Sequence, residues 1–403
     1  MDQNLVVSLC ARCKGNLLCG RIKCPLLEKF KFLSTYSDIS GELEKPTPPS
    51  VFVGRMGYPK VYIGPLMTLS DLEQPEYMDS PWMWSGKNIE DVISLRSSLL
   101  RGVKRVEVNS NDQSNDYYLV NLQEAAASTT HMDLETEVQK VIKRPVFDDV
   151  MQPMGMTGHI DSFKFLQNPK IPHKVEKIYY DDLNATSSVK QLFDSGFNTY
   201  YLQRIFSVGM MGEQSRRKLV PTRWSITAVH DILGEELKKE VQDFPSIDSC
   251  MLFRFQHFGN HFEVILTPGN YSFELAEIWM GESFWNPEST YVGYDREDIM
   301  KKKDYSTLSG GYYAARLPVL EYMKKKRRKA SITVLREIRP EYYAPLGVWV
   351  VEEGARKAMN TTPEVFESYQ GALESAAQYL RTPREKWLHH LGSGYQSSLA
   401  QFV

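Results

Sequence analysis

The sequence contains no apolar run that approaches the ~20 residues a helix needs to span a membrane. Residues 1–4 lack the positive charge with which a secretory signal begins. We therefore expect a cytoplasmic protein that makes no contact with a membrane. The chain also lacks a Gly-x4-Gly-Lys-Ser/Thr motif and a Gly-x-Gly-x-x-Gly motif after a strand, which argues against ATP hydrolysis and dinucleotide binding.

An excess of charge of one sign is missing too, because 48 Lys and Arg residues stand against 50 Asp and Glu residues, for a formal net charge of −2. No global positive field steers such a chain toward nucleic acid, so any contact of that kind must come from local basic patches. Length and apolar material are present. The 403 residues favour two or three domains of ~100 to 200 residues each, and a hydrophobic content of 42% supplies large cores.

Cysteine is scarce, with five residues, yet four of them lie close together near the N-terminus in the spacing Cys-x2-Cys-x5-Cys-x4-Cys. A disulfide framework does not persist in a reducing compartment, whereas four thiolates complete the closed tetrahedron that structural Zn²⁺ prefers. A redox pair or an iron–sulfur cluster is the alternative. Basic residues around the cysteines could lie on a phosphate backbone or simply be solvated. The predicted zinc ligands are Cys10, Cys13, Cys19 and Cys24.

Residues 51–66 consist of two β-branched and aromatic runs joined by a glycine turn that bears Arg55, and we expect a hairpin there. An arginine at such a bend can meet a phosphate, or it can be a turn residue with no ligand. The preceding residues 45–50 are rich in proline and should form an extended, exposed link. A helical pattern begins near residue 187, is interrupted at Gly196 and resumes toward residue 206.

The densest polar cluster follows at residues 209–225, where glycines, cations, hydroxyl groups and a tryptophan come together. Cations hold phosphates, and an indole ring offers a stacking face to an unpaired base. Arg223 and Trp224 could equally pack together in a domain interface by a cation–π contact. The candidate nucleic-acid contacts of the whole chain are Arg55, Arg216, Arg217, Lys218, Arg223 and Trp224.

The clearest hairpin covers residues 251–266, with Gly259 and Asn260 as its two-residue turn. His257 and His261 then point to opposite sides, so they do not form a metal site. A second compositional unit begins near residue 286. Its basic run at 324–329 is a solvated helix end or a DNA-binding stripe. Its predicted elements are a helix at 314–325, strands at 331–338 and 347–352, and two helices that open at Thr362-Pro363 and Thr382-Pro383.

The last eight residues have the pattern Gln-x-x-aliphatic-x-x-aromatic-apolar. A tight turn with three residues per turn places Leu399 and Phe402 on one side, and the glycines and serine at 392–394 supply a flexible leash. DNA replication and repair proteins insert peptides of this form into the sliding clamp. A tail folded back onto its own domain is the alternative. The peptide comprises Gln396, Ser397, Ser398, Leu399, Ala400, Gln401, Phe402 and Val403.

Four further stretches of sequence are distinctive: Cys19-Gly20 to Cys24-Pro25, Phe52-Val53-Gly54 with Gly57-Tyr58-Pro59, residues 220–229, and Tyr342-Tyr343-Ala344-Pro345-Leu346-Gly347-Val348-Trp349. With them the chain resembles the archaeal Nre family of DNA repair proteins, and the resemblance covers almost the whole chain. It implies an N-terminal and a C-terminal domain, a zinc finger formed by the four cysteines, a clamp-binding peptide at the end, and participation in the repair of damaged DNA.

These observations predict an α+β fold of mixed helices and mainly antiparallel strands in two domains, with a small N-terminal zinc knuckle and a flexible C-terminal tail. We expect the C4-type zinc finger at residues 1–31, the two domains at 51–285 and 286–391, and the tail at 392–403.

The expected function is that of a DNA repair factor in the response to DNA damage, which binds zinc, contacts DNA and is recruited to the sliding clamp. A metal-dependent nuclease is the alternative, and an adaptor without DNA contact is a further one. The resemblance transfers no catalytic residue, so the sequence leaves open whether the protein is an enzyme. The carboxylates that could hold Mg²⁺ are Asp148 with Asp149, Asp181 with Asp182, and Glu274 with Glu277.

Overall fold

The computed structural model of the protein describes residues 39–69, 74–109, 116–142, 148, 150–281 and 289–392, together with 13, 17–18 and 20–24. Its described residues divide at Leu233 and Gly234 into an N-terminal unit and a C-terminal unit. None of the helices in this described part of the chain combines the length and the apolar composition that crossing a membrane requires.

A six-stranded sheet organises the N-terminal unit, in the order β1-β5-β6-β4-β3-β2. Its neighbouring strands are antiparallel except for β4 and β6, which pair in parallel. The strands are β1 (Gly41–Thr47), β2 (Val51–Val53), β3 (Lys60–Thr68), β4 (Leu99–Glu107), β5 (Met132–Ile142) and β6 (Thr157–Phe165).

The expected exposed link at residues 45–50 is wrong, because β1 pairs with β5 as far as Thr47 and residues 47–50 are buried. Its prolines suggested a link, but β1 is an edge strand of the sheet. At an edge, a residue such as Pro46 can turn its missing N–H away from the ladder without breaking a hydrogen bond. The hairpin expected at residues 51–66 is confirmed by the pairing of β2 with β3.

Asparagine caps the start of several helices in the N-terminal unit. Asn184 accepts a hydrogen bond from Ser187 N at 2.9 Å to start α6, and Asn198 accepts one from Tyr201 N at 2.9 Å to start α7. Between them Gly196 has a φ of +94°, which ends the helical pattern as expected. The α-helices are α3 (Ile89–Ser97), α4 (Tyr117–Ala127), α5 (His173–Tyr180), α6 (Ala185–Asp194), α7 (Thr199–Ser207) and α8 (Thr222–Val241), and the boundary between the units falls within α8. Short 3-10 helices are η1 (Pro75–Asp79), η2 (Pro81–Met83) and η4 (Gln214–Arg216).

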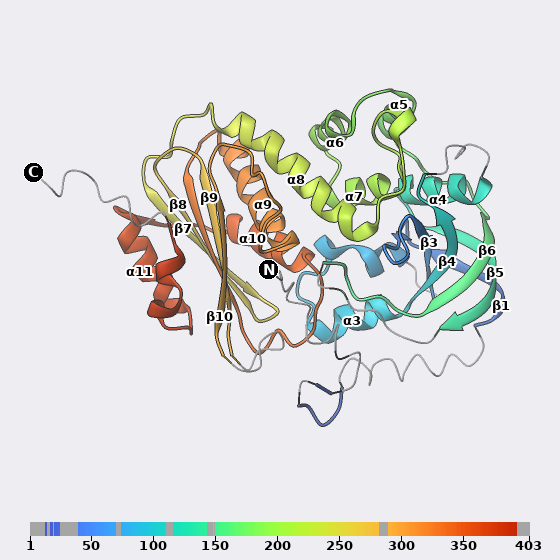
Figure 1. Ribbon diagram of the computed structural model, residues 1–403, viewed down its shortest axis with the longest axis horizontal. Coiled ribbons are helices and arrows are strands. Elements are labelled where there is room, and N and C mark those ends of the chain that lie inside the picture. Colours follow the sequence, from blue (N-terminus) through green and yellow to red (C-terminus); the bar gives the residue numbers. More distant parts are fainter. Residues whose placement is uncertain are drawn as a thin grey trace, which may run out of the picture. The chain divides into compact units, whose positions relative to one another are not determined.

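The C-terminal unit has a second six-stranded sheet, in the order β10-β9-β11-β8-β7-β12, with β11 parallel to β9 and antiparallel to β8. Figure 1 shows α11 on one face of this sheet and α9 with α10 on the other. The strands are β7 (Cys250–His257), β8 (Asn260–Thr267), β9 (Ser272–Trp279), β10 (Tyr291–Glu297), β11 (Ser331–Ile338) and β12 (Glu364–Phe366). The helices are α9 (Gly310–Lys326), α10 (Trp349–Met359), α11 (Tyr369–Tyr379), η5 (Arg384–Lys386) and η6 (Leu388–His390). These two mixed, mainly antiparallel sheets with their helices confirm the α+β prediction.

The 251–266 hairpin exists, but its turn lies one residue earlier than expected. His257 pairs with Asn260, which leaves Phe258 and Gly259 as the turn, with φ values of +50° and +69°. Asn260 belongs to the strand because it also pairs with Ile338 of β11. The register moves by two residues along the partner strand, so the two histidines remain on opposite faces as expected.

Three other expectations for the C-terminal unit are corrected. Residues 347–352, expected as a strand, lead into α10, which begins at Trp349, since the period of a short, fully buried apolar run does not separate a strand from a helix. Thr362 does not cap a helix; β12 follows it, and Ser368 caps α11 by accepting from Gly371 N. At Thr382 only the 3-10 helix η5 follows, and Thr382 N donates to buried Glu337 at 2.7 Å.

Candidate nucleic-acid interface

An exposed turn joins β2 to β3 and displays the side chains of Arg55 and Tyr58. Gly54 N donates to Tyr62 O at 2.7 Å and Lys60 N donates to Gly57 O at 2.9 Å, which closes the turn. Gly57 has a φ of +82°, and a Cβ there would lie 2.9 Å from Lys60 O. Only glycine fits this position without strain, so the sequence of the turn fixes where Arg55 and Tyr58 are presented.

Trp224 stands on the first turn of α8 and packs against this turn. The start of α8 is tied to β2 because Val53 N donates to Thr222 Oγ1 at 2.9 Å. The rings of Tyr58 and Trp224 lie 5.2 Å apart with an interplanar angle of 52°. Their exposed fractions are 42% and 45%. We call Tyr58 and Trp224 the aromatic pair; each ring still offers surface on which a base could stack.

Asp148 links the two arginines nearest to the aromatic pair. Its Oδ1 lies 2.5 Å from Arg223 Nη1, and its Oδ2 lies 3.9 Å from Arg55 Nη2. The same carboxylate accepts from Val150 N at 2.8 Å and Met151 N at 3.1 Å, so it is fixed in position. Arg223 is mostly buried and its charge is directly compensated. Arg55 is half exposed and is held only loosely, which leaves it able to contact a phosphate.

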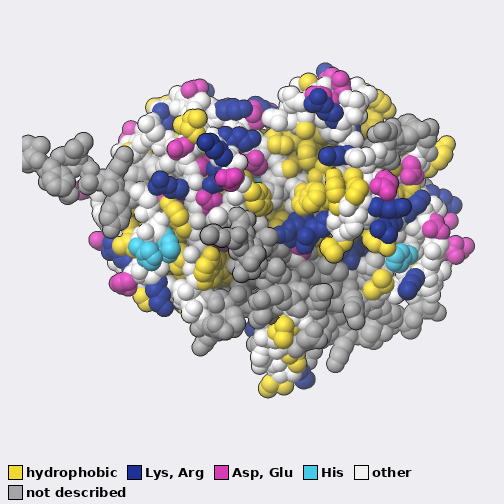
Figure 2. Space-filling view, viewed as in Figure 1, with side chains coloured by type: hydrophobic (Ala, Val, Ile, Leu, Met, Phe, Trp, Pro, Cys, Tyr) yellow, Lys and Arg dark blue, Asp and Glu magenta, His cyan; other side chains and the backbone are white. Residues whose placement is uncertain are grey.

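The remaining basic candidates have different surroundings. Arg217 donates from Nε to Gly212 O at 2.7 Å and from Nη1 to Tyr179 O at 2.7 Å, and burial lowers its pKa. It therefore holds the C-terminal end of α5 against the loop rather than a ligand. Arg216 is exposed and pairs with Glu213 at 3.1 Å, and Lys218 is exposed. Figure 2 shows basic and acidic side chains interspersed on the face in view, in keeping with the near-neutral net charge.

Sequence reasoning identified Arg55 and Trp224 separately and overlooked Tyr58, which brings them into one site. The signal was the aromatic residue that follows Gly57 in the turn, because the tip of a hairpin usually lies at the surface.

The carboxylate pairs proposed for a nuclease are engaged in other contacts where the structure describes them. Asp182 Oδ1 accepts from Gln214 N at 2.9 Å, and Asp148 serves the arginines described above. Glu274 and Glu277 lie on opposite faces of β9; the first accepts from Tyr294 Oη at 2.9 Å and the second from Arg336 Nη1 at 2.6 Å. Within the described ranges, no group of three or more His, Cys, Asp or Glu residues is placed to hold a metal ion. Asp149 lies outside those ranges.

Of the predicted zinc ligands, the structure describes Cys13 and Cys24, while Cys10 and Cys19 lie outside the described residues. Cys13 is buried, and its Sγ accepts a hydrogen bond from Leu18 N at 3.2 Å. Gly20, between the two described cysteines, has a φ of +71°. A buried sulfur that accepts from a backbone amide fits a zinc knuckle ligand. The eight residues of the clamp-binding peptide also lie outside the described residues.

Two family models match the chain. The model described as "Archaeal Nre, N-terminal" matches residues 18–286, and the one described as "Archaeal Nre, C-terminal" matches residues 297–402. No solved structure shows a significant match.

Curated relatives match over most of their length. "DNA repair protein NreA" of Archaeoglobus fulgidus is 54% identical over 98% of this chain and 98% of its own length. "DNA repair protein NreB" of the same organism is 34% identical over 98% of this chain and 100% of its own length. "DNA repair protein NreA" of Haloferax volcanii is 34% identical, over 82% of this chain and 81% of its own length.

Proposed function

The chain belongs to the archaeal Nre family, and we infer from this membership that it is a DNA repair protein acting in the response to DNA damage. Its near full-length similarity to relatives that bear this name carries the conclusion. Two finer statements belong to the same proposal: the protein contacts DNA through the aromatic pair, and it is recruited to the sliding clamp by its last eight residues.

DNA contact is supported by the chemistry of the N-terminal unit. Tyr58 and Trp224 present partly exposed rings beside Arg55, whose guanidinium is only loosely held. Stacking of an unpaired base on an aromatic ring contributes ~1–3 kcal/mol, and an adjacent arginine adds a phosphate contact. This combination suits single-stranded DNA, whose bases have free faces, better than a closed duplex.

Clamp recruitment is supported by the pattern of residues 396–403, in which Leu399 and Phe402 form the apolar side of one turn. The last described residue is Gly392, so the peptide lies outside the described part of the chain. The four N-terminal cysteines would hold a structural Zn²⁺, whose closed coordination leaves no position for catalysis by the metal.

A direct test measures binding of a fluorescent single-stranded oligonucleotide by anisotropy. Trp224→Ala should weaken binding of the full chain about 5- to 150-fold, which corresponds to the loss of one stacked base. The matched control is Tyr117→Ala, which removes an exposed aromatic side chain from the start of α4 in the same unit and should leave binding unchanged.

Raising the salt concentration should weaken DNA binding by the wild-type protein, because phosphate contacts release counterions. Equal affinity of the Trp224→Ala and wild-type proteins would remove the aromatic pair from the proposed interface. Binding that is absent at low salt would favour the adaptor without DNA contact.

A further inference from the structure

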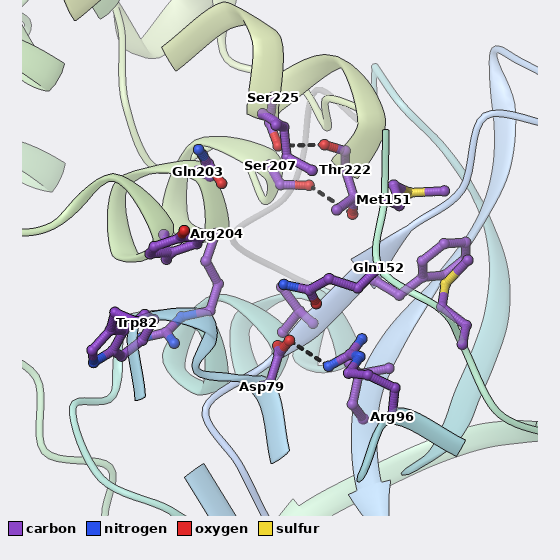
Figure 3. A pocket seen from close by; sticks show the side chains of 16 residues that line it. Asp79, Trp82, Arg96, Met151, Gln152, Gln203, Arg204, Ser207, Thr222 and Ser225 are labelled. Atoms are coloured by element: carbon purple, nitrogen blue, oxygen red, sulfur yellow. Dashed lines mark hydrogen bonds and ion pairs between the residues drawn. The ribbon is translucent and has the colours of Figure 1, made fainter. Parts of the chain in front are cut away.

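A cavity of about 90 Å³ lies in the N-terminal unit, and neither residue of the aromatic pair lines it. Its wall is built by β2, β3, the η1–η2 segment, α3, residues 151–154, α7 and the start of α8 (Figure 3). The space is several times the ~30 Å³ that one water molecule occupies, and it is below the ~300 Å³ of a pocket for a drug-sized ligand. It therefore suits a small polar group better than a whole nucleoside.

Arginine side chains dominate the polar part of this wall. Arg96 is buried, and its Nη1 pairs with Asp79 while its Nε donates to Pro153 O at 3.1 Å. Arg204 donates from Nε to Ala126 O at 2.6 Å and from Nη2 to Ser128 O at 2.9 Å. These carbonyls are neutral, so they orient the guanidinium of Arg204 without compensating its charge.

A third arginine lies directly behind the wall. The guanidinium of Arg101 is 4.6 Å from the ring centre of Phe52 and 3.3 Å from Met154 Sδ, and both of those residues line the cavity. Arg101 is 6% exposed, donates to Thr157 Oγ1, and its Nε has no hydrogen-bond partner. Its partners are thus neutral, although its side chain is almost fully removed from water.

The charges around the cavity do not balance. Among the described residues, Asp79 is the one carboxylate that bonds to any of the three arginines, which leaves an excess of two positive charges. Burial lowers the pKa of Arg101 to about 10, with repulsion from Arg96 acting in the same direction, and burial lowers the pKa of Arg204 to about 10. Uncompensated buried cations are costly, so a dianionic ligand would be stabilised here.

An aromatic side chain and an amide complete the wall. Trp82 is 41% exposed, and its ring lies 5.0 Å from that of Tyr200 with an angle of 31° between the planes. Figure 3 shows the amide of Gln152 directed into the same space as Arg96 and Asp79. No hydrogen bond of the Gln152 side chain to another described residue is present, so its donors are free for a ligand.

We propose that this cavity binds the terminal phosphate of a DNA strand, with Arg204, Arg96 and Gln152 around the phosphate and the terminal base stacked on Trp82. The proposal rests on the DNA contact proposed above and names the part of DNA that this unit recognises. A phosphate monoester carries −1.5 to −2 charges at neutral pH and so matches the excess of two, whereas an internal phosphodiester carries a single charge.

The test compares single-stranded oligothymidines that end in a 5′-phosphate, a 3′-phosphate or hydroxyl groups only, each with a dye at the opposite end. One of the phosphorylated strands should bind the full-length protein at least about tenfold more tightly than the hydroxyl-ended strand. Arg204→Gln should abolish this preference and Gln152→Ala should reduce it. Lys140→Gln, which removes an exposed cation from β5, should leave the preference intact.

Because Arg204 also holds the end of α4, its replacement could unfold the unit; Gln152→Ala removes no side-chain hydrogen bond within the described fold and therefore keeps the test valid. Thymidine monophosphate serves as a competitor to identify the source of the phosphate. If thymidine monophosphate competes as strongly as the phosphorylated strand does, the cavity is a phosphate site, and its ligand is a free nucleotide.

The ratio of the affinities for phosphorylated and hydroxyl-ended strands measures the contribution of the cavity. The affinity for the hydroxyl-ended strand, and its loss in Trp224→Ala, measures the contribution of the aromatic pair. The two proposals therefore fail separately. A ratio of one for both phosphorylated ends, together with no competition by thymidine monophosphate, overturns the phosphate site.

Discussion

Arg316 is the centre of a buried charge cluster in the C-terminal unit, and its removal should destabilise that unit strongly. The side chain is 1% exposed, and its Nη1 lies 2.9 Å from Glu235 Oε1 and 2.7 Å from Glu297 Oε2. Lys238 Nζ lies 2.9 Å from the same Glu235 oxygen and 3.6 Å from Glu297 Oε1. Two cations and two carboxylates therefore share one buried site, and the charges balance.

The variant Arg316→Met would leave two carboxylates with one cation. Breaking a buried ion pair by removing one partner costs about 3–5 kcal/mol, a large part of the ~5–15 kcal/mol that stabilises a typical domain. Tyr271 adds to the site, since its hydroxyl donates to Glu297 Oε1 at 2.8 Å, and burial together with that carboxylate raises its pKa well above the usual range. The side chain of Glu297 is 1% exposed, so solvent screens its uncompensated charge only weakly.

The double variant Arg316→Met/Glu297→Gln should be more stable than Arg316→Met by about 1–3 kcal/mol, because removing one carboxylate restores neutrality. Hydrogen–deuterium exchange of β9 and β11 peptides at increasing urea concentration measures the C-terminal unit, and β5 peptides of the N-terminal unit provide an internal control. The matched variant Arg328→Met, at an exposed position after α9, should change stability by less than about 0.5 kcal/mol. If the losses of stability caused by Arg316→Met and by Glu297→Gln simply add in the double variant, the reasoning from charge balance is refuted.

Three further predictions concern the tail, a histidine and the N-terminal cysteines. Phe402→Ala should abolish retention of the full chain by immobilised sliding clamp, whereas Gln401→Ala at a non-anchoring position should not; equal retention of Phe402→Ala and the wild type would exclude the peptide. Burial lowers the pKa of His257 to about 4, with repulsion from Lys357 adding to the effect, so the unfolded state binds the proton more readily. Stability of the C-terminal unit should therefore fall as pH drops from about 6.5 toward about 4, and His257→Gln should flatten this part of the urea-midpoint profile; an unchanged slope contradicts the assignment. The purified protein should contain one zinc ion per chain by elemental analysis, and Cys13→Ser should lower that content while Cys250→Ser, a buried strand residue, should not; metal-free wild-type protein would rule out the zinc knuckle.

The sequence predicted those elements whose local pattern agrees with their final environment. Strand β11 was expected at residues 331–338 and is found there, because residues 332–334 are β-branched and the two charged residues of the strand, Arg336 and Glu337, are held in ion pairs. The hairpin that bears Arg55 was expected for a similar reason, since its turn depends on a local glycine. The start of α10 was misread because Trp349, Val350 and Val351 are all buried, and a continuous apolar run carries no period.

The candidate site depends on contacts that no local pattern contains. Arg55 and Trp224 were identified one by one, but their meeting through Tyr58 requires the pairing of α8 with β2 by the Thr222 hydroxyl. Arg217 was a candidate because of its charge, and only the three-dimensional arrangement shows that its guanidinium donates hydrogen bonds to backbone carbonyls. The arginines of the cavity are spread over β4, α3 and α7, so their convergence was outside the reach of sequence spacing.

The position of β11 in its sheet determines when that sheet can be completed during synthesis of the chain. Strands β8 and β9 follow each other along the chain, yet they do not pair, because β11 is inserted between them after β10 and α9 have been synthesised. A nascent chain that ends before residue 331 thus holds two strands with unsatisfied inner edges, which invite pairing with other chains. The two inner edges are covered only when β11 has emerged from the ribosome. A chain whose translation stops before that point would be an aggregation-prone fragment rather than a partly functional protein.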